Sequence, residues 1–128
     1  MAAMTDYLRN KLMNHVTKNI AYTPPSSLWL ALFTTPADAS GGGTEVTGGG
    51  YARRPIPFTT PMGGSGYNSA DVFFPTATAP WNSIVSIAIF DANMAGNMLF
   101  YGKVTVPEFV NTGNTYVVEQ NDILLTMN

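Results

Sequence analysis

The stretch SIVSIAIF, residues 83–90, decides the fold class of this chain. Side chains alternate along a strand, so Val85, Ile87 and Ile89 share one face while smaller side chains and Ile84 share the other. Residues 91–97 then supply the Asp, Asn and Gly that tight turns favour. A second apolar run follows over residues 98–106. We therefore predict an antiparallel hairpin.

The segments on either side of this hairpin predict further short strands. Residues 27–34 are apolar on both alternating faces, which predicts a central strand that is buried from both sides or covered on one side by an N-terminal helix. Residues 51–58 contain prolines at alternate positions, which suits an edge strand or a strand leaving the sheet. Other short strands are predicted at residues 71–74, 115–119 and 123–127. The pattern predicts a mainly β fold, an antiparallel β-sandwich or flattened barrel of about seven strands preceded by one N-terminal α-helix.

The N-terminal helix is predicted over residues 5–20. Thr5 can cap its first turn, and apolar residues then recur every four positions, at Leu8, Leu12, Val16 and Ile20. A single helix of about four turns is not stable alone in water. Its apolar stripe must therefore lie on the β domain or on a neighbouring subunit, and Leu8, Leu12 and Val16 are candidate interaction residues.

The segment over residues 35–50 interrupts the strand pattern. It contains two glycine triplets, and Val46 is its only large apolar residue. Loops of this length in compact domains are usually functional or mobile. We expect a long Gly-rich loop that is flexible or ordered by a partner, inside a single β-rich domain that spans residues 1–128.

Composition narrows the classes of partner. Charged residues make up 11% of the 128 residues, the formal net charge is −2, and cysteine is absent. Six basic residues are too few to form the positively charged surface that binds nucleic acid. No apolar run approaches the roughly 18 residues that span a bilayer. We expect no nucleic-acid partner and no membrane partner, and neither disulfides nor thiolate metal sites can form.

No constellation of residues points to catalysis. His15 is the only histidine, and the eight carboxylates are scattered along the chain. Asp91, Asn93 and Asn97 resemble part of a calcium loop, but the acidic residue that closes such a loop is missing. Turn chemistry is the main interpretation, and ion binding there stays an alternative. We predict no catalytic residue, no metal site and no cofactor, and expect that the protein is not an enzyme.

Three short motifs follow one another in the first half of the chain: LALFTTP at residues 30–36, GTEV at 43–46 and GGGYAR at 48–53. Together with residues 81–90 and a hairpin containing Gly102, they resemble a family of small virion structural proteins of tailed bacteriophages, described as tail-fibre-like or as capsid decoration (cement) proteins. The resemblance implies a non-enzymatic, β-rich component of the virion.

The resemblance also implies partners. We expect a decoration protein on the capsid exterior that stabilises the lattice of the major capsid protein and forms a homotrimer with copies of itself. The contacts would involve the N-terminal segment and residues 35–54, where the candidates are Glu45, Tyr51, Arg53 and Arg54. Adjacent residues on a strand point to opposite faces, so one arginine can face a partner while the other pairs with a carboxylate inside the fold. The alternative is a tail-fibre-like or neck/tail attachment protein, with host-glycan binding as a possible property.

Overall fold

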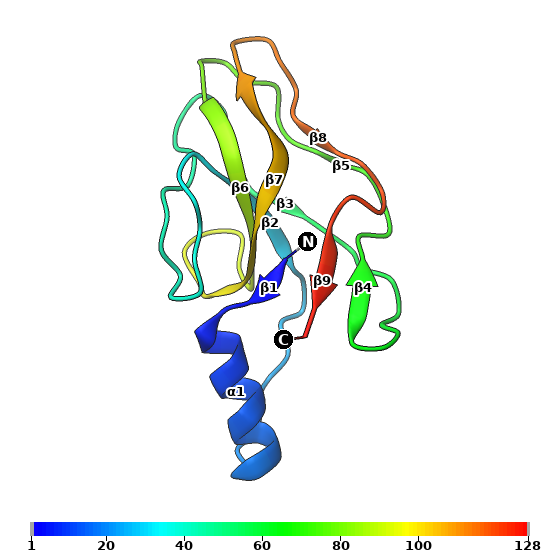
Figure 1. Ribbon diagram of the computed structural model, residues 1–128. Coiled ribbons are helices and arrows are strands. Elements are labelled where there is room, and N and C mark those ends of the chain that lie inside the picture. Colours follow the sequence, from blue (N-terminus) through cyan, green and yellow to red (C-terminus); the bar gives the residue numbers. More distant parts are fainter. Residues whose placement is uncertain (1, 128) are drawn as a thin grey trace.

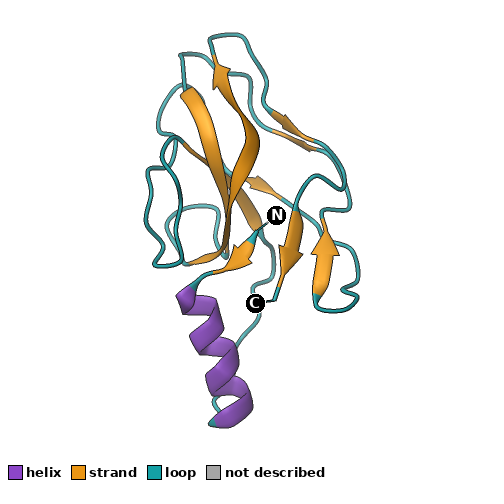
Figure 2. Cartoon of the chain, in the orientation of Figure 1, coloured by secondary structure: helices purple, strands orange, loops and turns teal. Residues whose placement is uncertain are grey.

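The computed structural model describes residues 2–127, which form one helix and nine short to medium strands (Figures 1 and 2). In chain order these are β1 (Ala3–Met4), α1 (Asp6–Thr17), β2 (Trp29–Phe33), β3 (Arg54–Pro55), β4 (Ser65–Tyr67), β5 (Val72–Phe73), β6 (Asn82–Phe90), β7 (Met98–Val110), β8 (Val117–Val118) and β9 (Leu124–Thr126). The predicted mainly β class with an N-terminal helix is confirmed.

The predicted hairpin is the centre of the largest sheet. Strands β6 and β7 pair antiparallel, with Ile87 opposite Gly102, inside a five-stranded sheet of order β1-β7-β6-β2-β3. Strand β3 lies at the sheet edge, as the prolines of residues 51–58 predict, because a proline has no N–H to donate to a neighbouring strand. Two further antiparallel pairs, β4-β9 and β5-β8, form small sheets of their own.

The main core lies between the large sheet and the two small sheets. Leu30, Leu32 and Ile89 contribute to it from the large sheet, and Val72 and Val118 contribute from β5 and β8. These side chains are each at most 7% exposed. The arrangement is therefore sandwich-like, with the two small sheets forming the second layer.

The other face of β2 is buried as well, as its doubly apolar pattern predicts. Ala31 and Phe33 pack there with Ala88 and Phe90, and the cover comes from Ala37 in the long loop. The loop is fixed to the sheet because the Ser86 hydroxyl donates to the Thr35 carbonyl and accepts from the Ala37 N–H, both at 3.0 Å. The alternative in which the helix covers this strand is wrong, since the loop covers it.

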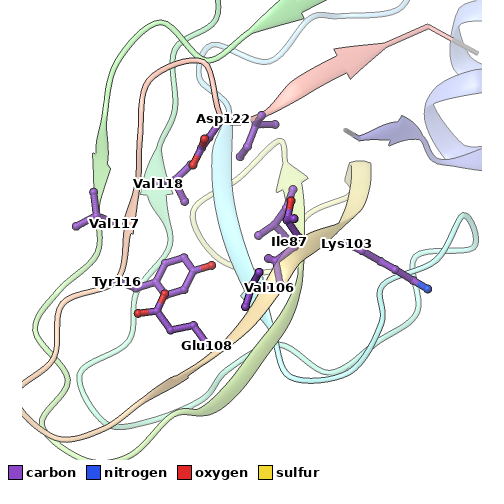
Figure 3. Close-up of a pocket in the computed structure, with 11 residues that line it drawn as sticks. Ile87, Lys103, Val106, Glu108, Tyr116, Val117, Val118 and Asp122 are labelled. Atoms are coloured by element: carbon purple, nitrogen blue, oxygen red, sulfur yellow. The ribbon is translucent and has the colours of Figure 1, made fainter.

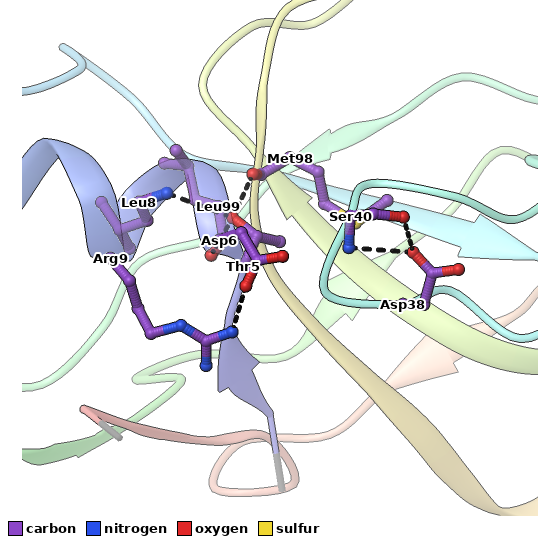
Figure 4. Close-up of polar contacts among 8 residues, drawn as sticks. All are labelled: Thr5, Asp6, Leu8, Arg9, Asp38, Ser40, Met98 and Leu99. Carbon is purple, nitrogen blue, oxygen red and sulfur yellow. Dashed lines mark hydrogen bonds and ion pairs between the residues drawn. The ribbon is translucent and has the colours of Figure 1, made fainter.

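Helix α1 is attached to the sheet near its N-terminal end. The buried Thr5 hydroxyl accepts from the Leu8 N–H at 3.3 Å and donates to the Met98 carbonyl at 2.7 Å (Figure 4). Leu8 packs against Met4 and Leu99. From there the helix projects away from the β domain (Figure 1). No helix within residues 2–127 is long and apolar enough to cross a membrane.

The helix ends at Thr17, before the predicted end at residue 20. Asn19 adopts a left-handed conformation with φ of 55°, which stops the helical path, and the Ile20 N–H turns back to the Asn14 carbonyl at 3.3 Å. The Tyr22 N–H donates to Nδ1 of His15 at 3.3 Å. The exposed His15 ring therefore supports the chain reversal after the helix.

Two strands were not predicted, β1 and β4. Strand β4 lies in a segment that reads only as Gly-rich, yet Ser65 and Tyr67 pair with Thr126 and Leu124 of β9. Next to it, the fully buried Asn68 joins distant segments, because its Nδ2 donates to the Glu119 carbonyl at 2.8 Å and its Oδ1 accepts from the Ile123 N–H at 2.8 Å.

Candidate interaction surfaces

The long loop is part of the folded domain. Val46 is 4% exposed and belongs to the main core. The Val46 N–H donates to the Leu32 carbonyl at 3.0 Å, and the Asp6 N–H, at the start of the helix, donates to the Ala39 carbonyl at 2.8 Å. The expectation of a loop that is flexible or ordered only by a partner is therefore wrong: this one chain orders it.

Asp38 holds the exposed tip of this loop. Its Oδ1 accepts from the hydroxyl and the N–H of Ser40 and from the Gly42 N–H, at 2.6, 3.0 and 2.9 Å (Figure 4 shows the Ser40 contacts). These hydrogen bonds, the Ser40 hydroxyl foremost, lower the pKa of the Asp38 carboxyl. The tip is a compact turn around one carboxylate.

Gly43 provides a direct test of how tightly the loop packs. Its φ is +111°, and a Cβ there would lie 2.8 Å from Cδ2 of Phe33 and 2.9 Å from the Pro36 carbonyl oxygen. We expect Gly43→Ala to lower the free energy of unfolding by about 2 kcal/mol, because left-handed strain and overpacking each cost about 1 kcal/mol or more.

The matched control for that variant is Gly41→Ala. Gly41 has φ of +86°, but a Cβ there meets no atom within 4 Å, so only the backbone strain of about 1 kcal/mol applies. Urea unfolding measures both variants. Equal decreases in the free energy of unfolding for the two variants would contradict a tightly packed loop.

Glu45, Tyr51 and Arg53 meet inside the fold. Oε2 of Glu45 accepts from the Tyr51 hydroxyl at 2.6 Å and from Nε of Arg53 at 2.8 Å, and Oε1 accepts from a terminal nitrogen of Arg53 at 2.8 Å. The Arg53 side chain is only 7% exposed. Burial, and then the bond to Glu45, raise the pKa of Tyr51 far above its usual value.

Arg53 also holds the turn after β6. Its Nη1 donates to the carbonyls of Ala92 and Ala95 at 2.9 and 2.8 Å, and the guanidinium lies 3.7 Å from the centre of the Phe90 ring. Two carbonyls of the turn proposed as an alternative ion site therefore already accept from a guanidinium. Within residues 2–127 there is no cluster of His, Asp and Glu that could hold a metal ion.

The two adjacent arginines have different environments. Arg53 pairs with a carboxylate inside the fold, whereas Arg54 is exposed on the edge strand β3. Of the four candidate interaction residues in residues 35–54, three thus join the long loop to the β6–β7 turn. Arg54 is the one whose side chain faces solvent.

The apolar stripe of the helix is largely uncovered. Leu8 is 6% exposed, but Val16 is 79% exposed, and Met13 and Ile20 are 62% and 55% exposed. Leu12, which is half-buried, lines an open groove of about 440 Å³ together with Met4, Arg9, Met13, Val16 and Met127. The β domain therefore covers Leu8 and part of Leu12 and leaves Met13, Val16 and Ile20 exposed in the single chain.

A second surface, which the sequence analysis did not identify, is the cleft between β7 and β8 (Figure 3). Its volume is about 270 Å³. The floor is apolar and buried, with Ile87, Val118 and Ile123 each at most 7% exposed. The rim carries the exposed side chains of Val106 and Glu108.

Tyr116 lies on the floor of this cleft between acidic groups. Burial raises the pKa of its phenol, and the nearby carboxylates of Glu108 and Asp122 raise it further. Neither carboxylate forms an ion pair within residues 2–127. The cleft therefore combines an apolar floor with the charged side chains of Glu108, Asp122 and Lys103.

Comparison with known families identifies the class of protein. The family model described as Podophage GP4 fiber I protein gp80 matches residues 3–126. A match over nearly the whole chain places it among the small structural proteins of tailed-phage virions. The chain belongs to the podophage GP4 fibre I protein gp80 family. No curated protein matches it.

Proposed function

We propose that this protein is a subunit of a virion fibre, attached to its neighbours through the exposed apolar face of helix α1. The observation that carries the proposal is the 79% exposure of Val16 in a helix that leaves the β domain. Exposed contiguous apolar surface of this kind is typical of interaction sites. The family to which the chain belongs is described as a fibre protein, which supports the fibre over the capsid surface.

Capsid decoration is the second candidate. It is favoured by the internally satisfied loop over residues 35–50, which makes the β domain a rigid unit suited to a lattice site. In this role the partner would be the major capsid protein, and the chain would form a homotrimer with copies of itself. Both candidates are non-enzymatic. A host-glycan contact would use exposed aromatic rings, which the chain offers at Tyr67, Phe73 and Phe109.

The number of copies in purified virions distinguishes the two candidates. Quantitative mass spectrometry, referenced to the major capsid protein, is expected to give a small copy number that matches the number of fibres. A copy number comparable with that of the major capsid protein would establish decoration instead. Absence from purified virions would contradict both.

The helix face can be tested in the same particles. Val16→Asp is expected to reduce incorporation into virions about tenfold or more, because placing a carboxylate in an apolar contact costs at least about 1.4 kcal/mol. Met94→Asp is the matched control, since Met94 is also 79% exposed but lies on the turn after β6. Thermal unfolding of both variants checks the fold, and normal incorporation of Val16→Asp would exclude this face from attachment.

A further inference from the structure

We propose that the cleft between β7 and β8 binds one neutral sugar ring, through hydrogen bonds to Tyr116, Glu108 and Asp122. The residues that line this cleft come from β6, β7 and the segment over residues 116–123. It is therefore a different surface from helix α1, and the proposal goes beyond virion attachment. Four features carry it: a buried hydroxyl without a partner, two carboxylates without partners, a mixed set of donors and acceptors, and the size of the cleft.

The Tyr116 hydroxyl is a polar group that the chain leaves without a partner. The residue is 8% exposed, yet its hydroxyl forms no hydrogen bond within residues 2–127. The hydroxyl points from the segment before β8 toward β7 (Figure 3). Its oxygen is open to the cleft, because no fully buried side-chain oxygen or nitrogen of the described residues lacks a partner. Polar groups in buried residues normally have partners, and a hydroxyl of a ligand would supply this one.

The ring that carries this hydroxyl is held in place. Tyr116 meets Phe74 edge to face, with 6.1 Å between the ring centres. The Phe74 N–H also donates to the Tyr116 carbonyl at 3.0 Å. A group that is already ordered in the free protein loses little conformational entropy when it binds a ligand. The Tyr116 hydroxyl is therefore preorganised for a contact in the cleft.

The carboxylates of Glu108 and Asp122 supply acceptors. Both side chains are exposed and line the cleft. Neither carboxylate has an ion pair or a hydrogen bond within residues 2–127. Both raise the pKa of the Tyr116 phenol, so both act on the same hydroxyl. An ionised carboxylate only accepts hydrogen bonds, and its bond with an O–H donor is stronger than a neutral one.

Donors line the cleft as well. Lys103 and Thr105 contribute an ammonium, which only donates, and a hydroxyl, which donates and accepts. The Lys103 side chain extends away from both carboxylates (Figure 3), so it leaves them free. The lining thus combines acceptors, donors and two hydroxyls. Sugar hydroxyls both donate and accept, and a sugar ring therefore matches this set.

The same groups disfavour other classes of ligand. An anion such as phosphate would be repelled by two carboxylates, and a cation would have Lys103 in the same lining. A wholly apolar molecule would take water from the carboxylates and from the Tyr116 hydroxyl without replacing its hydrogen bonds. An uncharged ligand with several hydroxyls has none of these costs.

The size and the floor of the cleft also suit one sugar ring. Its volume of about 270 Å³ corresponds to roughly nine water molecules at about 30 Å³ each, which is enough for a single ring. The floor is formed by Ile87, Val118 and Ile123, each at most 7% exposed. Sugar rings carry C–H groups beside their hydroxyls. We expect the C–H face to lie on this floor while the hydroxyls face the polar side chains.

Titration of the full chain with defined sugars, followed by NMR of its backbone amides, tests the proposal. The probes are D-glucose, D-galactose, D-mannose, L-rhamnose and N-acetyl-D-glucosamine, each raised to about 100 mM, well above the affinity expected for so small a ligand. We expect at least one of them to cause saturable shifts, with a Kd in the millimolar range. The shifts should lie at Val106, Val117 and Val118, and helix α1 should show none.

Tyr116→Phe removes only the hydroxyl. Because this hydroxyl has no partner in the chain, the variant should unfold at the wild-type temperature. It should bind the sugar about threefold to tenfold more weakly, since one hydrogen bond is lost. Tyr67→Phe is the matched control, because it makes the same change at an exposed ring on β4, and it should bind as the wild type does. Glu108→Gln removes a charged acceptor and should weaken binding about tenfold.

Methyl glycosides of the same sugars distinguish two sources of the ligand. The methyl group blocks the anomeric hydroxyl, as the next unit of a glycan does. Equal affinity for the methyl glycoside would assign the cleft to the terminal unit of a glycan. Loss of affinity would assign it to a free sugar. Both results support a sugar site.

Three results would overturn the proposal. They are the absence of saturable shifts with all five sugars, equal affinity of the wild type and Tyr116→Phe, and shifts of the same amides by methylguanidinium but by none of the sugars, which would make the cleft a cation site. All these measurements use the isolated chain. Their failure would therefore leave the fibre proposal unchanged, and failure of the virion experiments would leave the sugar site unchanged.

Discussion

Replacing Arg53 with alanine is expected to lower the free energy of unfolding by about 3 kcal/mol, because the Arg53 side chain is 7% exposed and its removal leaves the partly buried Glu45 carboxylate, 23% exposed, without its counter-charge. Glu45 would lose both of its contacts to the guanidinium, and the carbonyls of Ala92 and Ala95 would lose their donor. In a chain of this size the midpoint of thermal unfolding should fall by roughly 10–15 °C.

The adjacent residue provides the control. Arg54 is exposed on β3, and substitutions at exposed positions of this kind usually change stability by about 0.5 kcal/mol or less. Arg53→Ala and Arg54→Ala remove the same side chain and the same charge, so their difference isolates burial and pairing. Similar midpoints for the two variants would show that the Glu45–Arg53 cluster does not stabilise the domain.

Replacing Asn68 with alanine is expected to lower the free energy of unfolding by about 3 kcal/mol. The Asn68 side chain is fully buried and makes three hydrogen bonds, to the carbonyls of Ala70 and Glu119 and from the Ile123 N–H. Each buried backbone group left without a partner costs about 1–3 kcal/mol. Urea unfolding measures the loss.

Asn93→Ala is the control for this variant, since Asn93 is an exposed residue of the turn after β6. The free energy of unfolding of Asn93→Ala should differ from that of the wild type by about 0.5 kcal/mol or less. Hydrogen exchange adds a local measurement, because the Ile123 amide should lose protection in Asn68→Ala before the amides of β6 do. Unchanged exchange at Ile123 would contradict the assigned role of Asn68.

Local patterns in the sequence predicted the elements that depend on local physics. Alternating apolar residues predicted β6 and β7, and the capping residue Thr5 predicted the start of the helix. The prolines of residues 51–58 predicted an edge strand. The end of the helix was placed too late because the apolar stripe continues to Ile20, while the backbone reverses at Asn19.

Features that depend on contacts between distant residues were not predicted. Nothing in the composition of the Gly-rich loop shows that Val46 enters the core or that Ala37 covers β2; these positions follow from hydrogen bonds to Leu32 and Ser86. Adjacent arginines did indicate that one of them pairs internally, but they did not indicate which. The β7–β8 cleft forms between segments that are separate in the sequence, so no local motif marks it.

The pairing of Ala2 with the last strand has a consequence for how the protein folds. The Ala2 N–H donates to the Leu124 carbonyl at 2.7 Å, and the Thr126 N–H donates to the Ala2 carbonyl at 3.1 Å. These contacts close nearly the whole chain into a loop, and domains dominated by such distant pairings fold on a scale of about milliseconds to seconds. During synthesis on the ribosome, the pairing of Ala2 with β9 cannot form until β9 has emerged.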